Sequence, residues 1–367
     1  MRRPRAELAP NSYWPALDGL RGVAILLVFG FHLPFGPFRA GSYGVILFFV
    51  LSGFLITTVL LRELDKNNTV NLWRFYGRRA RRLFPALAVV VVAYLVLQLT
   101  ILGEPGQWWG RSWPVLAYVS NYVQISGTHL AHLSHTWSLA LEEHFYLLWP
   151  ITLLVIPRRW RFRVTVALVV AFATWRFKYL VTGATFDRIY LATDTNAFAP
   201  LLGCALAIGI HEKRIPRPGR NLSALATTAL VLAAFIGWPF FDRRLLYFTV
   251  PIALLAAVAI HGALFRPAVW LENPALRWFG KVSYGLYLWH FLIISLPWEE
   301  LLPIPAFIPM IVVPIALAGL SWRFIEAPVL GRSSRTEQPR RVRQALTATT
   351  AKVSDKNLNA GSGARVP

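Results

Sequence analysis

Long apolar stretches separated by short polar segments make up most of the chain. Each stretch is long enough, or nearly so, to cross the roughly 30 Å hydrocarbon core of a bilayer as a helix. The pattern therefore predicts an all-α, multi-pass membrane protein with about ten transmembrane helices. The expected spans cover residues 16–33, 43–61, 83–103, 137–156, 164–181, 196–210, 221–240, 246–264, 282–298 and 305–322.

Basic residues are distributed unevenly among the loops between these spans. With the N-terminus inside the cell, 31 of the 38 Lys and Arg residues fall on the inner side and 7 on the outer side. Loops of membrane proteins that stay in the cytoplasm carry an excess of Lys and Arg. We therefore expect both termini in the cytoplasm, Arg21 near the inner face and His32 near the outer face.

The composition agrees with a protein of the cell membrane. Hydrophobic residues make up 56% of the chain and charged residues 15%, whereas a soluble domain carries about 25% charged residues. The net charge of +21 does not indicate nucleic-acid binding, because the basic residues stand in short clusters between apolar runs. We expect contact with membrane lipid and none with nucleic acid. The single cysteine, Cys204, excludes an intrachain disulfide and a Cys-rich metal site.

The chain reads as one transmembrane domain over residues 1–330 and a basic cytoplasmic tail over residues 331–367. The tail is polar and lacks a hydrophobic period, so we expect it to be disordered and held near anionic lipid. No small-residue cleavage site follows the first span. We therefore expect that helix to be retained.

The first span carries an ionisable residue at each end. Arg21 and His32 are eleven positions apart, which is about three helical turns and roughly 16 Å along one face. Such groups are costly in a bilayer unless they have partners or a function. Asp18 is a plausible helix cap, but a cation near a helix N-terminus is unfavourable, so we expect an anionic group near Arg21. The alternative is that both residues merely bracket an ordinary span.

Two adjacent carboxylates, Glu142 and Glu143, open the span at 137–156. An unpaired carboxylate costs several kcal/mol in hydrocarbon, or becomes protonated. Neighbouring helix positions point about 100° apart, so at most one of the two can face a narrow site. We expect Glu142 at a depth similar to that of His32. The alternative is that these acids are interfacial or form structural ion pairs.

The densest basic run lies between residues 74 and 82 and contains Arg74, Arg78, Arg79, Arg81 and Arg82. Retention on the inner side and contact with lipid phosphate explain part of it. Arginine also binds phosphate through two parallel hydrogen bonds, so the run is a candidate anion site.

These motifs together resemble the membrane acyltransferase-3 family, integral-membrane O-acyltransferases of surface polysaccharides, glycolipids and macrolides. The resemblance rests on the spacing of Arg21 and His32, the run FFVLSGFL at 48–55, the stretch TWSLALEE at 136–143 and the stretch SYGLYLWH at 283–290. It covers nearly the whole chain to about residue 330. The chain departs from many members at Ile46, Asn196 and Ala327, where they carry Asp, Arg and Arg.

The resemblance implies transfer of an acyl group, acetyl or else succinyl, from cytoplasmic acyl-CoA to a hydroxyl of a cell-envelope glycan or glycolipid. The implied catalytic residues are His32, Glu142 and Arg21. The implied donor-binding residues are Arg79, Arg82 and Arg78. The substrate-binding candidates are Asn121, Trp137, Asp194, Tyr284 and His290. We expect Ser52 and Gly53 to serve helix packing, and the segment around Glu326 to end a helix at the inner face.

Two chemical routes remain open. In one, His32 is a general base that Glu142 orients or charges. In the other, His32 attacks the thioester and carries the acyl group. We expect no permanently bound cofactor, because acyl-CoA (acetyl-CoA or succinyl-CoA) is a substrate. We expect no metal, because no nearby Cys or carboxylate completes a site with His129, His132 and His135.

Other functions also remain open from the sequence. The chain could instead be a transporter or flippase of a lipid-linked sugar, or could acylate a small secondary metabolite. Some family members carry an extracytoplasmic esterase-like domain that passes the acyl group on to a glycan. We see none in this sequence, so we expect direct transfer, a separate partner protein, or a small-molecule acceptor.

Overall fold

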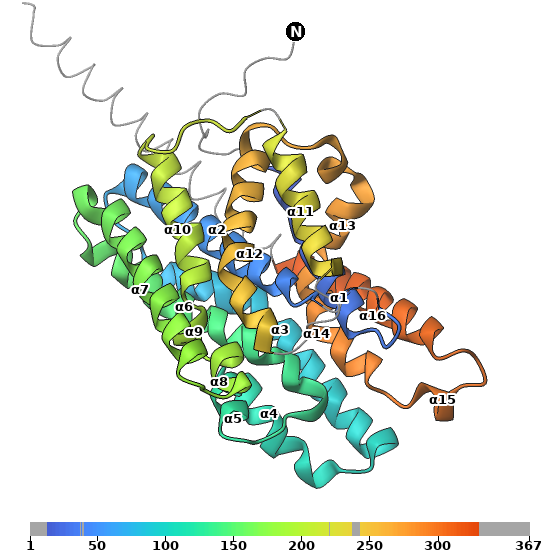
Figure 1. Ribbon diagram of the computed structural model, residues 1–367. Coiled ribbons are helices and arrows are strands. Elements are labelled where there is room, and N and C mark those ends of the chain that lie inside the picture. Colours follow the sequence, from blue (N-terminus) through green and yellow to red (C-terminus); the bar gives the residue numbers. More distant parts are fainter. Residues whose placement is uncertain (1–12, 37, 39, 220, 237–242, 330–367) are drawn as a thin grey trace, which may run out of the picture.

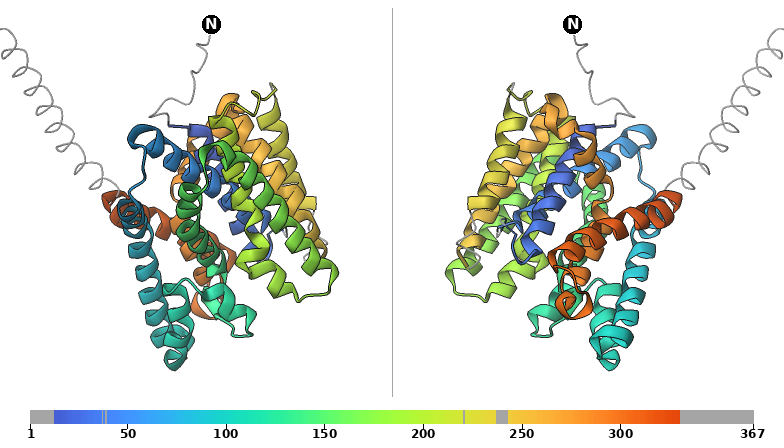
Figure 2. Two further views of the ribbon diagram at one scale, coloured as in Figure 1. Left: turned by 90° about the vertical axis from the view of Figure 1, so that its left-hand side faces the viewer. Right: turned by 90° about the vertical axis from the view of Figure 1, so that its right-hand side faces the viewer.

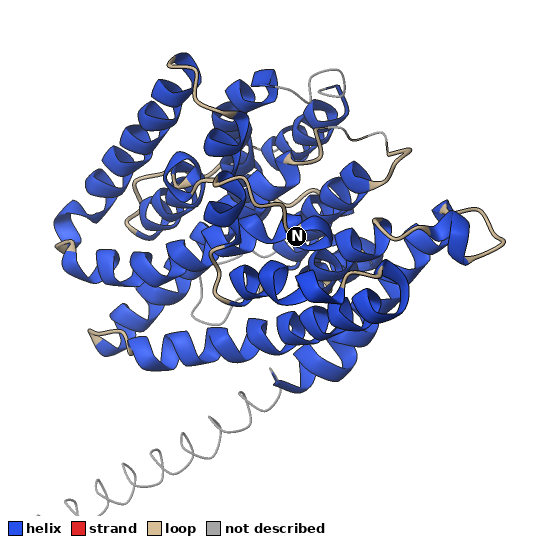
Figure 3. Ribbon diagram, turned by 90° about the horizontal axis from the view of Figure 1, so that it is seen from below, coloured by secondary structure: helices blue, strands red, loops and turns tan. Residues whose placement is uncertain are grey.

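The computed structural model describes residues 13–329 except 37, 39, 220 and 237–242, and the described chain contains helices and no strands (Figure 3). The predicted all-α fold class is therefore confirmed. The predicted tail at 331–367 lies outside the described residues. Each of the ten predicted apolar ranges contains a helix. These are α1 (Pro15–His32), α2 (Tyr43–Asn67), α3 (Leu72–Leu97), α6 (Trp137–Val155), α7 (Arg161–Val181), α10 (Phe198–His211), α11 (Leu222–Ile236), α12 (Arg243–Phe265), α14 (Ser283–Ile294) and α16 (Phe307–Ser321).

Short elements connect these helices. The short α-helices are α4 (Trp108–Leu116), α5 (Ser120–Ile125), α8 (Phe186–Leu191), α9 (Thr193–Asn196), α13 (Pro274–Lys281) and α15 (Trp298–Leu301). The 3-10 turns are η2 (Pro105–Gln107), η3 (Ala131–Thr136), η4 (Arg158–Trp160) and η6 (Val269–Glu272), and the π-helical turns are η1 (Gln98–Leu102) and η7 (Trp322–Glu326). Residues 104–136, which lie between the third and fourth predicted spans, are therefore largely helical.

Six helical stretches in the described chain are long and apolar enough to cross a membrane, judged by length and composition. They are Pro15–His32, Tyr43–Asn67, Leu72–Leu102, Arg158–Val181, Leu246–Phe265 and Phe307–Val329. Helices α10, α11 and α14 are apolar but shorter. Many exposed side chains on the outer helices are aliphatic, as on α6 at Leu147, Leu148 and Val155, which suits a surface that faces lipid. The chain is a multi-pass membrane protein.

Helices α1 and α2 occupy the middle of the bundle. The side views show α1 between α3 on one side and α11 and α12 on the other (Figure 1, Figure 2). Helix α2 packs closely against α10 through glycine. A Cβ atom on Gly53 would lie 1.9 Å from the carbonyl oxygen of Pro200, and one on Gly203 would lie 2.0 Å from that of Val50. The expectation that Gly53 serves helix packing is confirmed.

Helix α3 begins eleven residues before the predicted span. The Asn71 side chain caps it by accepting a hydrogen bond from the backbone N–H of Arg74 at 2.9 Å. The arginine run at 74–82 is therefore helical rather than a loop, and its side chains are held at fixed positions on the first turns of α3. The hydropathy pattern missed this boundary because five arginines interrupt it.

Candidate active site

A cavity of about 1590 Å³ extends into the bundle from the segments that follow α2 and α10. Its walls come from α1, α2, α3, α6, α10, α12 and α14, and its lining is strongly basic. The cationic residues are Arg21, Arg62, Lys66, Arg74, Arg78, Arg79, Arg81, Arg82, Lys213 and Arg217. The acidic ones are Glu63, Asp65 and Glu142. A cavity with this charge excess attracts anions.

The three predicted donor-binding arginines all line this cavity, but they differ in their partners. Arg79 donates from Nε to Oε1 of Glu143 at 2.8 Å, and its guanidinium lies over the Tyr146 ring. Arg78 is 3.7 Å from Glu63. Arg82 has no hydrogen bond or ion pair with any residue in the described part of the chain. Arg82 is therefore the arginine of the three most available to an external anion.

Arg21 lies in the same cavity and is held by α13 and α14. Its guanidinium donates to the Ser283 hydroxyl at 3.0 Å and to the Gly280 carbonyl oxygen at 3.3 Å. Two carboxylates, Glu142 and Glu326, interact with it electrostatically, but neither forms a hydrogen bond or ion pair with it in the described chain. The expectation of an anionic partner for Arg21 stays a prediction.

Glu326 is a residue whose position the sequence analysis missed. Its side chain is 3% exposed, accepts a hydrogen bond from Ser321 at 3.2 Å, and also interacts electrostatically with Arg82. We had interpreted its segment as a helix end. The available signal was an acidic residue that directly follows an apolar span, where a carboxylate needs a cationic partner.

Glu142 is not the partner of His32. It accepts a hydrogen bond from the Ser52 hydroxyl at 2.8 Å and lies in the cavity with Arg21 and Arg79. Among the described residues, no hydrogen bond or ion pair joins Glu142 to His32. The predicted pairing is therefore wrong, because the turn of α6 that carries Glu142 faces the arginines. Ser52, which we expected only to pack, holds this carboxylate.

The partner of His32 is His290 on α14. The Nδ1 atom of His32 lies 3.2 Å from Nε2 of His290 and 2.9 Å from the carbonyl oxygen of Val28. His290 is fully buried. The ring of His135, from η3, lies 5.2 Å from the His290 ring, so three histidines from three elements gather here. In the described part of the chain, no set of three or more His, Cys, Asp or Glu side chains has a geometry that could hold a metal ion.

The histidine cluster lies close to two residues that line the cavity, Ser138 and Tyr287. The Tyr287 hydroxyl donates to the His135 carbonyl oxygen at 2.7 Å and lies 2.6 Å from the Ser138 hydroxyl. The Tyr287 and His290 rings are 5.4 Å apart. Tyr287 therefore contacts the histidine cluster and also lines the basic cavity.

Two further predicted residues contact neither His32 nor each other. Tyr284 lines the cavity and donates its hydroxyl hydrogen to the Leu83 carbonyl oxygen at 2.8 Å, which ties α14 to α3. Trp137 is 7% exposed and packs against Tyr190 and Phe49, with ring distances of 4.7 and 6.1 Å. In this structure Trp137 is a core residue and does not line the cavity.

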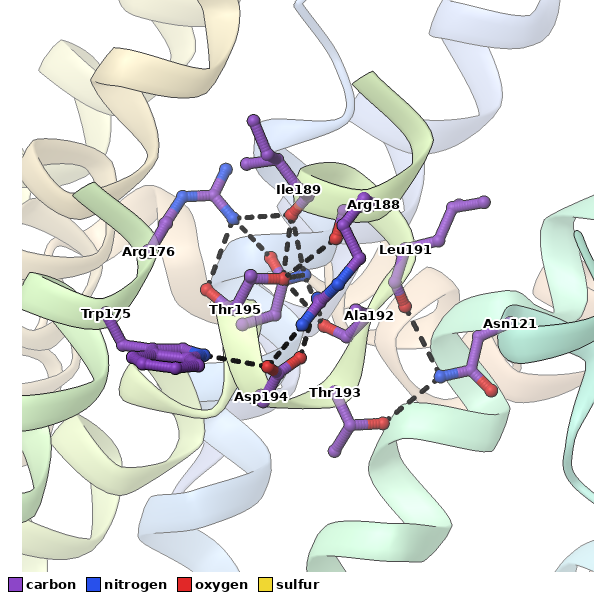
Figure 4. Close-up of polar contacts among 11 residues, drawn as sticks. Asn121, Trp175, Arg176, Arg188, Ile189, Leu191, Ala192, Thr193, Asp194 and Thr195 are labelled. Carbon is purple, nitrogen blue, oxygen red and sulfur yellow. Dashed lines mark hydrogen bonds and ion pairs between the residues drawn. The ribbon is translucent and has the colours of Figure 1, made fainter. Parts of the chain in front are cut away.

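Asn121 and Asp194 belong to a separate polar network around α8 and α9 (Figure 4). Asn121 donates from Nδ2 to the Thr193 hydroxyl at 3.1 Å and to the Leu191 carbonyl oxygen at 3.3 Å. Asp194 accepts from Arg188 at 2.6 and 2.8 Å. Neither residue lines the cavity. The network holds the segment between α7 and α10 in place.

Arg176 anchors the same network and was not singled out by the sequence analysis. Its side chain is 1% exposed and donates to the carbonyl oxygens of Ile189 and Thr195 at 2.9 and 3.2 Å (Figure 4). It also donates to Oδ1 of Asn196 at 3.1 Å. Backbone and amide dipoles stabilise this buried cation. The arginine that many family members carry at the place of Asn196 is absent, and Arg176 brings a guanidinium to that place from α7.

The ion pair of Asp194 predicts a pH-dependent contribution to stability. Burial opposes the charged form, but hydrogen bonds from Arg188 and Trp175 outweigh burial and lower the pKa of Asp194. A carboxyl with a lowered pKa stabilises the fold above its unfolded pKa of about 4, and that contribution disappears as the pH falls through the folded pKa. We expect Asp194→Asn to lower the free energy of unfolding by about 1 kcal/mol at pH 7.

The measurement is thermal unfolding in detergent from pH 3 to pH 7. The difference between wild type and Asp194→Asn should shrink toward pH 3. The control is Asp187→Asn, which removes an exposed carboxylate from the same segment. A difference that grows toward acid pH would contradict the assignment.

Comparison with known proteins identifies relatives over most of the chain. Residues 14–323 match the acyltransferase-domain family. The chain is 34% identical to the peptidoglycan O-acetyltransferase OatA of Listeria monocytogenes, over 87% of this chain and 56% of the relative. It is 33% identical to the putative peptidoglycan O-acetyltransferase YrhL of Bacillus subtilis, over 89% of this chain and 56% of the relative.

A third relative is the putative O-acetyltransferase SAS0844 of Staphylococcus aureus, which is 32% identical over 86% of this chain and 57% of the relative. The chain thus spans a little over half the length of these curated relatives. No solved structure matches the chain.

Proposed function

The chain belongs to the acyltransferase-domain family, and on this premise we propose that it transfers an acetyl group from cytoplasmic acetyl-CoA to a hydroxyl of a cell-envelope glycan. The observation that carries the proposal is the basic cavity, whose lining residue Tyr287 lies next to the His32–His290 pair. The cavity suits a phosphate-bearing donor, and the pair suits chemistry on a thioester.

The cavity would orient the donor along the bundle. The phosphates of coenzyme A would bind at the wide basic end, near Arg82 and the other arginines of α3. The pantetheine arm would extend toward Ser138 and Tyr287. The thioester would then lie next to the histidines, and the donor would not have to cross the membrane.

His32 supports two routes. As a general base, it would remove the acceptor's hydroxyl proton while the oxygen attacks the thioester carbonyl, and would return that proton to the departing thiolate of coenzyme A. As a nucleophile, it would form an acyl-imidazole and release coenzyme A, and the acceptor hydroxyl would then take the acyl group. In either route Glu142 and Glu326 would offset the charge of the cavity arginines rather than act on His32.

The names of the relatives favour an acetyl donor and a peptidoglycan acceptor over succinyl-CoA, a glycolipid or a small metabolite. A glycan on the outer side would approach the histidines from the side opposite to the cavity. This arrangement requires ten spans with both termini in the cytoplasm, which is the topology that the Lys and Arg distribution favours.

Labelling of single cysteines in intact cells tests this topology. The native Cys204 is free and fully buried, so it provides a silent background. Both test positions are exposed: Ser126 lies on the proposed outer side and Lys66 on the proposed inner side. We expect a membrane-impermeant maleimide to label Ser126→Cys in intact cells and Lys66→Cys only after permeabilisation. The reverse pattern would exclude the proposed path of the donor.

His32→Ala tests the proposed activity. We expect ester-linked acetyl on the cell-wall glycan to fall by about 100-fold or more, because general acid–base catalysis contributes on that scale. The measurement is mass spectrometry of glycans from cells that lack the protein and carry either wild type or the variant at equal protein level. His129→Ala, which changes an exposed histidine, is the control and should keep the acetyl mass. An acetyl level in His32→Ala equal to that of wild type would favour a transporter.

Arg82→Gln tests the donor site. Loss of one charge-assisted hydrogen bond to phosphate should raise the Kd for acetyl-CoA by about 10- to 100-fold. The fold should tolerate the change, because Arg82 forms no ion pair with the described residues. Calorimetric titration in detergent gives the Kd. Arg159→Gln, which removes an exposed charge outside the cavity, is the matched control. Equal affinity of wild type and Arg82→Gln would refute the donor site.

A further inference from the structure

The backbone of α14 determines which nitrogen of His290 carries hydrogen. The Nδ1 atom of His290 lies 2.7 Å from the carbonyl oxygen of Tyr287 and 3.1 Å from that of Leu286. Carbonyl oxygens only accept hydrogen bonds, so Nδ1 must carry a hydrogen. A neutral imidazole has one N–H, and a buried ring without a carboxylate partner is neutral. Nε2 of His290 therefore carries a lone pair.

The same reasoning then assigns the hydrogen of His32. Its Nδ1 atom faces two acceptors, Nε2 of His290 at 3.2 Å and the Val28 carbonyl oxygen at 2.9 Å. Nδ1 must therefore be the N–H, shared between them. The opposite assignment would place a lone pair of His32 against the lone pairs of Val28. Nε2 of His32 thus carries the free lone pair.

We propose that His290 is the positioning residue of His32, and that it fixes the ring and the tautomer in which Nε2 is the reactive atom. This inference rests on the proposed acyl transfer for its catalytic meaning, but the hydrogen-bond assignment stands without it. His290 has the orienting role that the sequence analysis gave to Glu142. Such a role resembles that of the third residue in a nucleophile–base arrangement.

A neutral hydrogen-bond acceptor such as His290 suits the positive charge that would develop on His32 during the proposed reaction. When Nε2 of His32 takes up a proton or an acyl group, the His32 ring becomes positively charged. The Nδ1–H bond to the lone pair of His290 then becomes charge-assisted and stronger. His290 forms no covalent bond, and the hydrogen stays on His32. A carboxylate at position 290 would place a permanent charge in a fully buried part of α14.

Nitrogen NMR on the full-length protein tests the assignment without any activity. The protein is labelled with ¹⁵N-histidine, and His32→Gln and His290→Leu identify the two rings. We expect an Nδ1–H tautomer for both histidines and a coupling through the hydrogen bond between Nδ1 of His32 and Nε2 of His290. An Nε2–H tautomer for His32, or no coupling in wild type, would overturn the proposal.

Single-turnover acyl transfer tests the catalytic meaning. His290→Leu removes the acceptor and should slow the acyl-transfer step by about 10²- to 10⁴-fold, with an unchanged Kd for acetyl-CoA, since His290 does not line the cavity. In His290→Gln, Oε1 is as many bonds from Cα as Nε2 of histidine is, and the rate should stay within about 10-fold of wild type. The shorter side chain in His290→Asn cannot place its oxygen at the position of Nε2, so this variant should resemble His290→Leu.

The matched control is His261→Leu, which removes a buried imidazole that packs against Phe265 on α12, and should keep the wild-type rate. A wild-type rate in folded His290→Leu, or a loss in His290→Gln as deep as in His290→Leu, would overturn the positioning role. If the wild-type protein transfers no acyl group, the proposed function fails, but the NMR measurement still tests the hydrogen bond between His32 and His290. If the variants do not fold, the coupling measured in the wild-type protein still tests that hydrogen bond.

Discussion

The rest of this structure depends on the placement of positive charge in a medium that does not tolerate it. Ten cationic side chains line one cavity that contains only three carboxylates. The bundle accommodates them because α2, α3 and α6 leave a large space at the end of the molecule where the basic segments lie. Glu142, in the cavity, and Glu143 and Glu326 beside it each interact electrostatically with an arginine, whereas Arg82 has no hydrogen bond or ion pair with the described residues. An anionic ligand would complete this balance.

The histidine cluster, in contrast to the cavity, contains no permanently charged side chain. The described hydrogen-bond partners of His32 and His290 are backbone carbonyl oxygens and each other, so this pair stays polar without a fixed charge. Tyr287 lines the cavity, and its ring lies 5.4 Å from that of His290. Cationic side chains and a neutral imidazole pair therefore lie in different environments of one bundle. This arrangement suits the proposed donor, whose phosphates and thioester lie at opposite ends.

The polar network around Arg176 stabilises a buried positive charge in a different way. No carboxylate is among the hydrogen-bond partners of Arg176 in the described chain. The carbonyl oxygens of Ile189, Thr195 and Leu246 and Oδ1 of Asn196 take that role. These contacts fix the segment that leads into α10, which in turn packs against α2 through Gly203. Asn121 and Asp194 are best understood as parts of this support, which keeps the walls of the cavity in place.

The sequence by itself determined the helical class, the positions of the long helices along the chain and the basic run, because hydropathy and charge along the chain are local properties. It also singled out Arg21, His32 and His290. Only the tertiary structure decided which of these groups meet. Partners such as His32 and His290 are 258 positions apart. The direction in which Glu142 points depends on the packing of α6 against α2 and α3, and no spacing along the chain contains that information. The burial of Glu326 beside Arg82 has the same origin.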